Sequence, residues 1–241
     1  MSGAIQDRNP GQSQEESDKP AASPPADDRA KFTGVPILYY RPGACALAPH
    51  ILLHWTGQAH VAKRAERSDA ELLAINPSGA VPALRTAEGR GLTQAAAILQ
   101  HIAVRAGRSD LLGGDDLDAR DEVAMWLSFF TGDFHPAFWP YFAPMMYIAG
   151  PADEASPAIK RAGIELVRRG LAKIDAHLAG RDTFVGASKT AVDAYSVPML
   201  RWAKNIEGVE FATFGDAARY YAQVVSDPGV VAAMQEQGIQ P

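Results

Sequence analysis

The chain contains a single cysteine, Cys45, in the stretch RPGACALAPHILLHW, where it follows a Pro-Gly turn and precedes an expected helix. Unpaired N–H groups at the start of a helix favour an anion, so a thiol in that position loses its proton more easily. A thiolate is a nucleophile, whereas a neutral buried thiol behaves as a small hydrophobic side chain. The position of Cys45 alone is compatible with both roles.

The residues that follow Cys45 exclude one kind of thiol chemistry. A dithiol oxidoreductase uses a Cys-x-x-Cys motif, but the residue three positions after Cys45 is Ala48. Thiol chemistry at Cys45 therefore requires a second thiol from outside the chain, and glutathione is the obvious cellular source. A single cysteine also excludes an intrachain disulfide and a metal site built from several cysteines, and we expect no metal.

The stretch NPSGAVPAL, residues 76–84, contains a second candidate site. Pro82 opens a strand made otherwise of Val and Leu, a position where its missing N–H is tolerated. A cis Val81–Pro82 bond would turn the backbone N–H and C=O of Val81 outward, where they could pair with an extended peptide ligand. Most X–Pro bonds are trans, however, so the residues alone give this arrangement little support.

Length, composition and charge narrow the functional classes. The 241 residues, 47% of them hydrophobic, suit one large domain or two small ones. A net charge of −5 without a basic stripe argues against nucleic acid or a membrane surface as a partner. No apolar run reaches the ~18 residues of a membrane-spanning helix. The scarcity of cysteine fits a reducing compartment, and we expect a cytoplasmic protein.

The sequence pattern divides the chain into three parts. Residues 1–35 are rich in Ser, Pro, Gln, Asp and Glu and poor in aliphatic residues, which predicts a disordered polar tail. Residues 36–108 predict the element order β-α-β-α-β-β-α, and therefore a small mixed sheet covered by helices. Residues 118–236 carry almost no strand signals and predict an all-helical domain.

Local signals predict several element boundaries. Ser68 is the expected N-cap of a short helix over residues 69–75. Pro136 is expected to break or kink the helical pattern of residues 117–142. Residues 156–179 carry apolar side chains on one broad face and predict a long amphipathic helix.

From residue 37 to residue 236 the chain resembles a glutathione S-transferase, specifically of the bacterial beta class. The resemblance rests on five segments in the family's order, of which RPGACALAPHI is the most class-specific part: ILYYRPGACALAPHILL, INPSGAVPAL, LTQAAAILQHIA, WLSFFTGDFHPAF and KTAVDAYSVPMLRW. It implies an α/β thioredoxin-like N-terminal domain followed by an all-α helical C-terminal domain.

The resemblance also implies two catalytic residues and a backbone contact. Cys45 matches a cysteine that lies against the glutathione sulfur and can form a mixed disulfide with it. His135, in Phe134-His-Pro136, matches a histidine near that sulfur, where a side chain with a near-neutral pKa can relay a proton. Val81 matches the residue whose backbone pairs with the cysteinyl part of glutathione, and the proline that matches Pro82 is cis in the family.

Three more glutathione-binding residues are implied, and each departs from the family pattern. Gln94 stands where the family usually has an acid that meets the glutathione ammonium, and Ala95 replaces a frequent Ser at the start of the same helix. Ser128 stands where many members have an asparagine that reaches the partner subunit's site. Lys63 and Arg64 are the two candidates to replace a lysine that the family has in a region that is shorter here.

Other polar residues are expected to have structural roles. Thr190 and Asp193 have the spacing of a helix N-cap, which in this superfamily serves folding. His54, His60, His101 and His177 lie in no comparable motif and are given structural roles. Aromatic side chains between residues 129 and 142 are mostly expected in the core, and some of them could line an apolar pocket.

The resulting prediction is a detoxifying homodimeric transferase that joins glutathione to a small hydrophobic electrophile, or uses it to reduce disulfides or peroxides. Glutathione is then a co-substrate, and no metal is needed. An alternative interpretation is a glutathione S-transferase-like protein without turnover that binds ligands or partners; Gln94-Ala95 favours it, whereas Cys45 and His135 argue against it. A thiol-dependent dehalogenase or lyase is a third possibility that the sequence does not separate.

Overall fold

The computed structural model describes residues 34–149 and 152–241, with the side chains of 152–155 left out. The predicted disordered tail, residues 1–35, lies outside this range except for residues 34 and 35. Among the described residues, no helix combines the length and apolar character that crossing a membrane requires.

The N-terminal part is built on a four-stranded mixed sheet. Strands β1 (Ile37–Tyr40), β2 (Val61–Arg64), β3 (Ala83–Arg85) and β4 (Gly91–Thr93) lie in the order β2-β1-β3-β4. Strand β1 is parallel to β2 and antiparallel to β3, which is antiparallel to β4. The mixed sheet expected from the element order is therefore confirmed.

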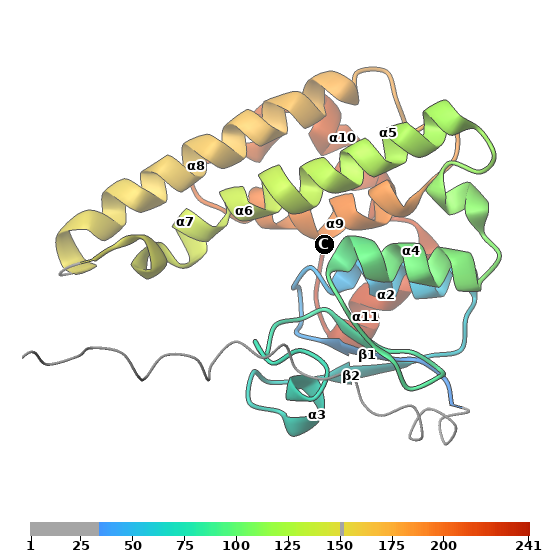
Figure 1. The fold of residues 1–241 in the computed structure, drawn as a ribbon. Coiled ribbons are helices and arrows are strands. Elements are labelled where there is room, and N and C mark those ends of the chain that lie inside the picture. The colour runs from blue at the N-terminus through green and yellow to red at the C-terminus, as the bar shows by residue number, and fades with distance from the viewer. Residues whose placement is uncertain (1–33, 150–151) are drawn as a thin grey trace, which may run out of the picture.

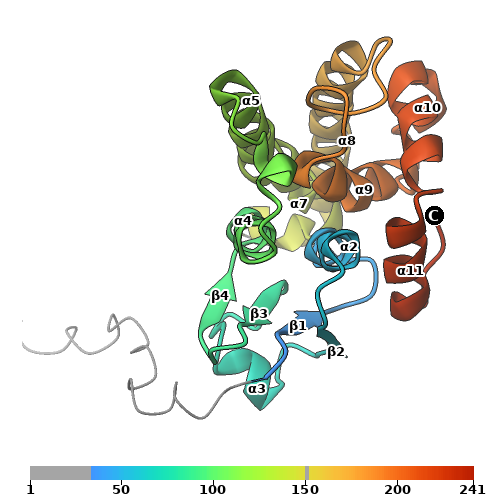
Figure 2. The same cartoon turned by 90° about the vertical axis from the view of Figure 1, so that its right-hand side faces the viewer.

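Three helices accompany this sheet. Helices α2 (Leu47–Thr56) and α4 (Ala95–Arg105) cover one face, and the short α3 (Ala70–Leu73) lies on the other side (Figure 2). The predicted cap of α3 is wrong, because the N-cap is Asp69 and not Ser68. The Asp69 side chain caps no helical N–H; its Oδ2 accepts a hydrogen bond from the Glu66 N–H at 2.8 Å.

The rest of the chain is helical, and Figure 1 shows it stacked above the sheet. Its elements are η1 (Ser109–Leu112), α5 (Leu117–Ser128), η2 (Phe129–Phe134), α6 (His135–Ala137), α7 (Trp139–Phe142), η3 (Pro144–Tyr147), α8 (Ala152–His177), α9 (Ala191–Lys204), η4 (Phe211–Thr213), α10 (Gly215–Val224) and α11 (Pro228–Gln237). This arrangement confirms the expected thioredoxin-like sheet with an all-helical second part.

The irregular segment η2 positions His135, the predicted catalytic histidine. The helix that begins at Leu117 becomes a π-helix over Phe129–Phe134, and His135 with Pro136 follows directly. The sequence pattern predicts a break at Pro136, and the irregular part of the helix already begins at Phe129. Wide π turns re-aim the side chains that follow them and are frequent at functional sites.

Helix α9 connects the two halves of the molecule. It lies between α2 and the outer helices α8 and α10 (Figures 1 and 2). Its start carries the predicted capping box: Thr190 Oγ1 accepts from the Val192 N–H, and the Asp193 carboxylate accepts from the Thr190 N–H at 2.7 Å. The cap fixes the start of α9, and with it the side chains that α9 presents to α2.

Candidate functional site

Cys45 lies at the end of the turn that joins β1 to α2. Its side chain is 6% exposed, and its Sγ donates to the Val81 carbonyl oxygen at 3.5 Å. The Val81–Pro82 peptide bond is cis, as the family resemblance implied. The structure therefore brings together the predicted thiol and the predicted peptide-pairing loop, which are 36 residues apart in the sequence.

The electrostatic environment of Cys45 differs from the expectation drawn from its position. Burial raises the pKa of the Cys45 thiol to about 12. The backbone N–H groups of Cys45 and Ala46 and the charge of Arg41 lower the pKa, as expected near a helix start, but their effects are smaller. The thiol is therefore protonated at neutral pH and acts as a hydrogen-bond donor in the unliganded protein.

His135 is enclosed by aromatic side chains. Its ring stacks on Trp139 at a centroid distance of 5.7 Å and meets the edge of Trp202 at 5.0 Å. Burial lowers the pKa of His135 to about 4, so the imidazole is neutral at pH 7. The expected near-neutral pKa is therefore wrong, because the aromatic enclosure removes the water that would stabilise an imidazolium.

Tyr195 links the histidine to the cysteine, and sequence analysis did not single it out. Its hydroxyl oxygen lies 3.0 Å from His135 Nδ1. Burial raises the pKa of Tyr195, and the negative charge of a Cys45 thiolate would raise it further, which indicates that the two groups are close. Tyr195 lies in the segment KTAVDAYSVPMLRW, but in that segment only Thr190 and Asp193, the helix-capping residues, have a spacing that predicts a role.

Contacts from the helical part fix the turn that carries Cys45. Gly43 has a φ of 70°, a conformation that favours glycine, and a Cβ there would lie 3.0 Å from Arg201 Nη1. Trp202 Nε1–H donates to the Gly43 carbonyl at 2.7 Å, and the Gly43 N–H donates to Gln237 Oε1 at 3.1 Å. Helices α9 and α11 therefore hold the turn through the carbonyl and the N–H group of Gly43, respectively.

Gln94 and Ala95 lie at the start of α4, as predicted. Gln94 is exposed and has a φ of 69°, an uncommon conformation for a residue other than glycine. Its side chain caps no N–H group of α4, while Ala95 is buried. The Gln94 amide is therefore free to face a ligand, and the N–H groups of the first turn of α4 face the same surface.

The remaining predicted contacts are not brought to Cys45 within the chain. Ser128 is exposed at the end of α5, and its carbonyl accepts a hydrogen bond from Thr131 Oγ1. Lys63 and Arg64 form exposed ion pairs with Glu71 and Glu66, respectively. The Ser128 contact stays a prediction that depends on a second subunit.

The predicted aromatic segment divides between core and surface. Phe130 and Phe138 are fully buried, whereas Phe129 and Phe134 line a hollow of about 620 Å³ beside α8. Lys173 reaches the rim of this hollow, with its Nζ 4.2 Å from the centre of the Phe129 ring. The hollow is apolar enough for a hydrophobic molecule, but its lining does not include Cys45 or His135.

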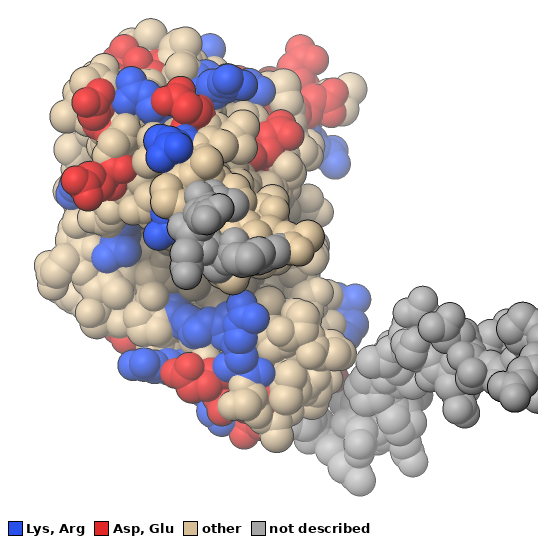
Figure 3. All heavy atoms as spheres, turned by 90° about the vertical axis from the view of Figure 1, so that its left-hand side faces the viewer, with Lys and Arg blue, Asp and Glu red and all other residues tan. Residues whose placement is uncertain are grey.

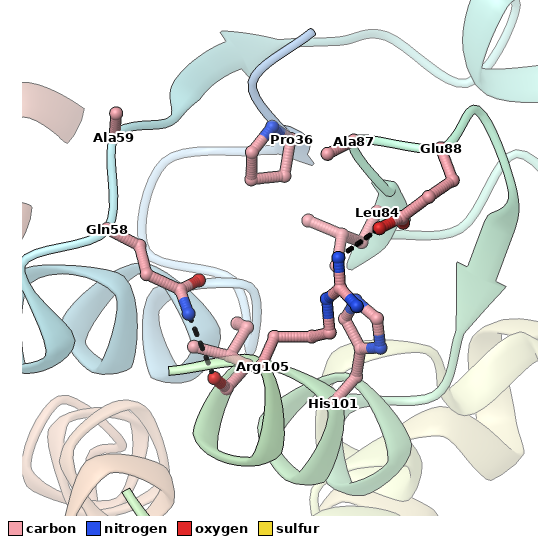
Figure 4. A pocket seen from close by; sticks show the side chains of 9 residues that line it. Pro36, Gln58, Ala59, Leu84, Ala87, Glu88, His101 and Arg105 are labelled. Atoms are coloured by element: carbon pink, nitrogen blue, oxygen red, sulfur yellow. Dashed lines mark hydrogen bonds and ion pairs between the residues drawn. The ribbon is translucent and has the colours of Figure 1, made fainter. Parts of the chain in front are cut away.

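A second hollow, of about 270 Å³, lies between the sheet and α4 (Figure 4). Arg105 and Glu88 form an ion pair across it, and Gln58 donates to a backbone carbonyl of α4. It opens beside Pro36, which precedes β1, whereas Cys45 follows the other end of that strand. It is therefore separate from the thiol.

Arg41 brings a positive charge to the turn that carries Cys45. In Figure 1 the chain passes from β1 to α2 on the left, the side that faces the viewer in Figure 3. Lys and Arg side chains gather in the lower half of that face. Arg41, which directly follows β1, donates from Nη1 to the Gly79 carbonyl at 3.1 Å.

Comparisons with known proteins agree with this geometry. Residues 43–105 match the family model "Glutathione S-transferase, N-terminal domain". Glutathione S-transferase GST-4.5 of Xanthomonas campestris pv. campestris is 35% identical over 208 residues, which are 84% of this chain and 98% of that protein.

Solved structures give the same result. A bacterial beta class glutathione S-transferase of Sphingomonas chungbukensis is 32% identical with a TM-score of 0.75, and a sphingomonad glutathione S-transferase complexed with glutathione is 33% identical with a TM-score of 0.73. Each alignment covers 85% of this chain and all of the other. The chain therefore belongs to the glutathione S-transferase family, and its structural neighbours include members of the bacterial beta class.

Proposed function

We propose that this protein is a glutathione transferase that joins glutathione to small hydrophobic electrophiles, or reduces disulfides or peroxides with it, at a site centred on Cys45. The observation that carries the proposal is the Cys45 thiol bonded to the Val81 carbonyl at the cis-proline loop. The relative solved with glutathione supports the choice of co-substrate.

In the proposed binding mode, the backbone of Val81 pairs with the cysteinyl part of glutathione, beside Pro82. The γ-glutamyl carboxylate lies at the start of α4, where the N–H groups of the first turn and the helix dipole favour an anion. The Gln94 amide oxygen accepts a hydrogen bond from the glutathione ammonium. Such a pose directs the glutathione sulfur toward Cys45.

Catalysis consists mainly of holding the glutathione sulfur as a thiolate. Because Cys45 is protonated, its S–H can turn from the Val81 carbonyl to donate to that sulfur, and the Tyr195 hydroxyl, hydrogen-bonded to neutral His135, supports the same charge. In conjugation, the sulfur then forms a bond to the electrophilic carbon, and the displaced group leaves with the bonding electron pair. Cys45 need not itself attack the substrate.

The decisive experiment is glutathione binding by calorimetry, followed by a panel of small electrophiles, peroxides and mixed disulfides. Saturable binding with turnover on the panel supports the proposal. Binding without turnover on any of them favours the second candidate, a ligand-binding or interaction protein of the same fold. The neutral pair Gln94-Ala95 is the observation that keeps this second candidate open.

The first prediction concerns the missing acid at the start of α4. Gln94→Glu is expected to tighten glutathione binding by about 1–2 kcal/mol, because a charge-assisted hydrogen bond to the ammonium is about twice as strong as a neutral one. Calorimetry measures the change. A glutathione analogue without the amino group is the control, since it should gain nothing, and high salt should reduce the gain.

An unchanged or weaker affinity of the Gln94→Glu variant would contradict the binding mode. The ammonium would then be met by another acid, or the pocket would be shaped for a different ligand.

We also propose that the protein is a cytoplasmic homodimer with a role in detoxification. Apolar side chains on α5 and η3 support a dimer, since Met125, Met145, Met146 and Tyr147 are each more than half exposed. Light scattering is expected to give roughly twice the chain mass of 25.8 kDa. A monomer at micromolar concentration would contradict both the dimer and the glutathione contact of Ser128.

A further inference from the structure

Three histidines and a glutamate from three separate elements converge on the side of α2. His50 and His54 are four residues apart and lie on one face of this helix, His60 directly precedes β2, and Glu236 comes from α11. One potential ligand atom of each residue lies within 4.8 Å of those of the other three. None of the four residues belongs to the proposed glutathione site, although Gln237 joins His50 to the turn that carries Cys45.

The three imidazole rings have the spacing that three histidines have when they bind one metal ion. The ring centroids are 5.2 Å apart for His50–His54, 5.5 Å for His50–His60 and 5.2 Å for His54–His60. Three imidazoles on one tetrahedral ion, with metal–nitrogen distances near 2.0–2.1 Å, have their centroids about 5.2 Å apart. The histidines therefore need only small side-chain rotations to share an ion.

Glu236 supplies the fourth donor and the negative charge. One of its carboxylate oxygens lies 2.8 Å from His50 Nε2, and the other lies 3.3 Å from His54 Nε2. It is half exposed, with a side-chain exposure of 49%, so it also lies where an ion can enter from solvent. Three neutral imidazoles and one carboxylate are borderline ligands that suit a divalent transition metal.

Neither His60 nor His54 has its Nε2 committed to a hydrogen bond. His60 Nδ1 lies 2.8 Å from the Gln58 carbonyl, to which it donates, so its Nε2 is left unprotonated in the neutral ring. Metal-binding histidines typically make such a hydrogen bond through their other nitrogen. His54 Nε2 is buried, and the Glu236 oxygen 3.3 Å away does not meet it in the geometry of a hydrogen bond.

His50 must move its proton from Nε2 to Nδ1 before its Nε2 can bind the same ion as His54 and His60. The Gly43 N–H bonds Gln237 Oε1 at 3.1 Å, so the amide nitrogen of Gln237 faces His50 Nδ1 at 3.2 Å. His50 Nδ1 therefore accepts, and its Nε2–H donates to Glu236. For a metal to bind Nε2, the proton moves to Nδ1, and the Gln237 amide turns to accept from it, which takes Gln237 Oε1 away from the Gly43 N–H.

We propose that His50, His54, His60 and Glu236 bind one divalent transition-metal ion, with Zn²⁺ as the ion best matched to four nitrogen and oxygen ligands in tetrahedral geometry. This proposal differs from the sequence-based expectation of no metal, which considered only sites built from several cysteines. It is independent of the proposed transferase activity. The ion would fasten α11 to α2, next to the turn that carries Cys45.

The test is titration of the full chain, free of any histidine tag, with Zn²⁺ in a calorimeter. We expect one ion per chain. His54→Gln and His60→Gln should each weaken binding by at least about 10–100-fold, the loss known even for groups that only orient ligands. Both side chains lie near the surface, so both variants should fold. His101→Gln, on α4 outside the cluster, is the matched control and should bind as the unaltered chain does.

Two further measurements make the result unambiguous. Co²⁺ in place of Zn²⁺ should give the intense visible absorption of a tetrahedral ion, and this absorption should be lost in the His54→Gln variant. Zn²⁺ should raise the melting temperature of the unaltered chain and of the control but not of that variant, because an ion stabilises the state that binds it. Absence of stoichiometric Zn²⁺ binding, or equal binding by all variants, would overturn the proposal whether or not the protein is a transferase.

Discussion

Asp193→Ala will lower the free energy of unfolding by about 3–4 kcal/mol, because it leaves several buried donors without a partner at once. The Asp193 side chain is 1% exposed. Its carboxylate accepts from the Phe184 N–H at 3.0 Å, from both donors of Thr190, and from the Tyr220 hydroxyl at 2.8 Å. Burial raises the pKa of Asp193, and these donors oppose that effect. Equilibrium denaturation with urea measures the loss.

Asp116→Ala is the matched control. Asp116 also caps a helix, accepting from the Asp118 and Ala119 N–H groups at the start of α5, but it is exposed. Water can replace a lost carboxylate there, so the expected cost is about 1 kcal/mol. Equal losses in the two variants would mean that burial adds nothing to the cap of α9. The larger loss for Asp193 would show that this residue anchors the loop at Phe184 as well as the helix.

Signals that act over a few residues predicted the fold closely. The element order β-α-β-α-β-β-α expected for residues 36–108 is the order of β1 to α4 in the structure. The capping box at Thr190 was likewise predicted from spacing alone. Each of these features depends on one stretch of chain and its own hydrogen bonds, so the sequence contains everything needed to predict it.

The chemistry of the site was harder to predict, because it depends on burial. The position of Cys45 at a helix start suggested a lowered pKa, but the packing of the second part of the chain over the first raises it. The same enclosure shifts His135 in the opposite sense, since burial always disfavours the charged form. The local pattern predicted which groups meet at the site but not their protonation states.

Contacts between distant segments were missed altogether. Nothing near Tyr195 in the sequence indicates that it meets His135, which is 60 residues earlier. His50 and His54 could have been noticed as a helical pair, but His60 and Glu236 join them only through the packing of β2 and α11. Such clusters become visible only when the tertiary structure is known.

Oxidised glutathione will add the mass of one glutathione, about 305 Da, to the native protein, and Cys45→Ala will abolish the adduct. The reaction requires the Cys45 thiolate to attack the disulfide, forming a new S–S bond and releasing reduced glutathione. A reductant such as dithiothreitol should reverse it. Intact-protein mass spectrometry gives the yield directly, and the chain has no other cysteine to complicate the result.

The pH dependence of this reaction tests the environment of Cys45. With a pKa of about 12, the thiolate fraction is small at pH 7 and rises about tenfold for each pH unit up to about pH 10. The initial rate of adduct formation should rise in the same proportion, whereas a pKa near 7 would give a rate that levels off above pH 8. Tyr195→Phe should alter this profile, because an ionised Cys45 and the Tyr195 hydroxyl influence each other electrostatically.

The Cys45→Ser variant separates the two roles that the thiol can have. Serine keeps one O–H donor, which can turn from the Val81 carbonyl to the glutathione sulfur, but it cannot form a disulfide. If Cys45 acts only as a donor, this variant should lose the adduct and keep conjugation of electrophiles, while reduction of mixed disulfides through Cys45 is lost. A thiol that stays unreactive in the native protein and reacts only after denaturation would mean that Cys45 is a packing residue. Glutathione would then have to be activated by Tyr195 and His135 alone.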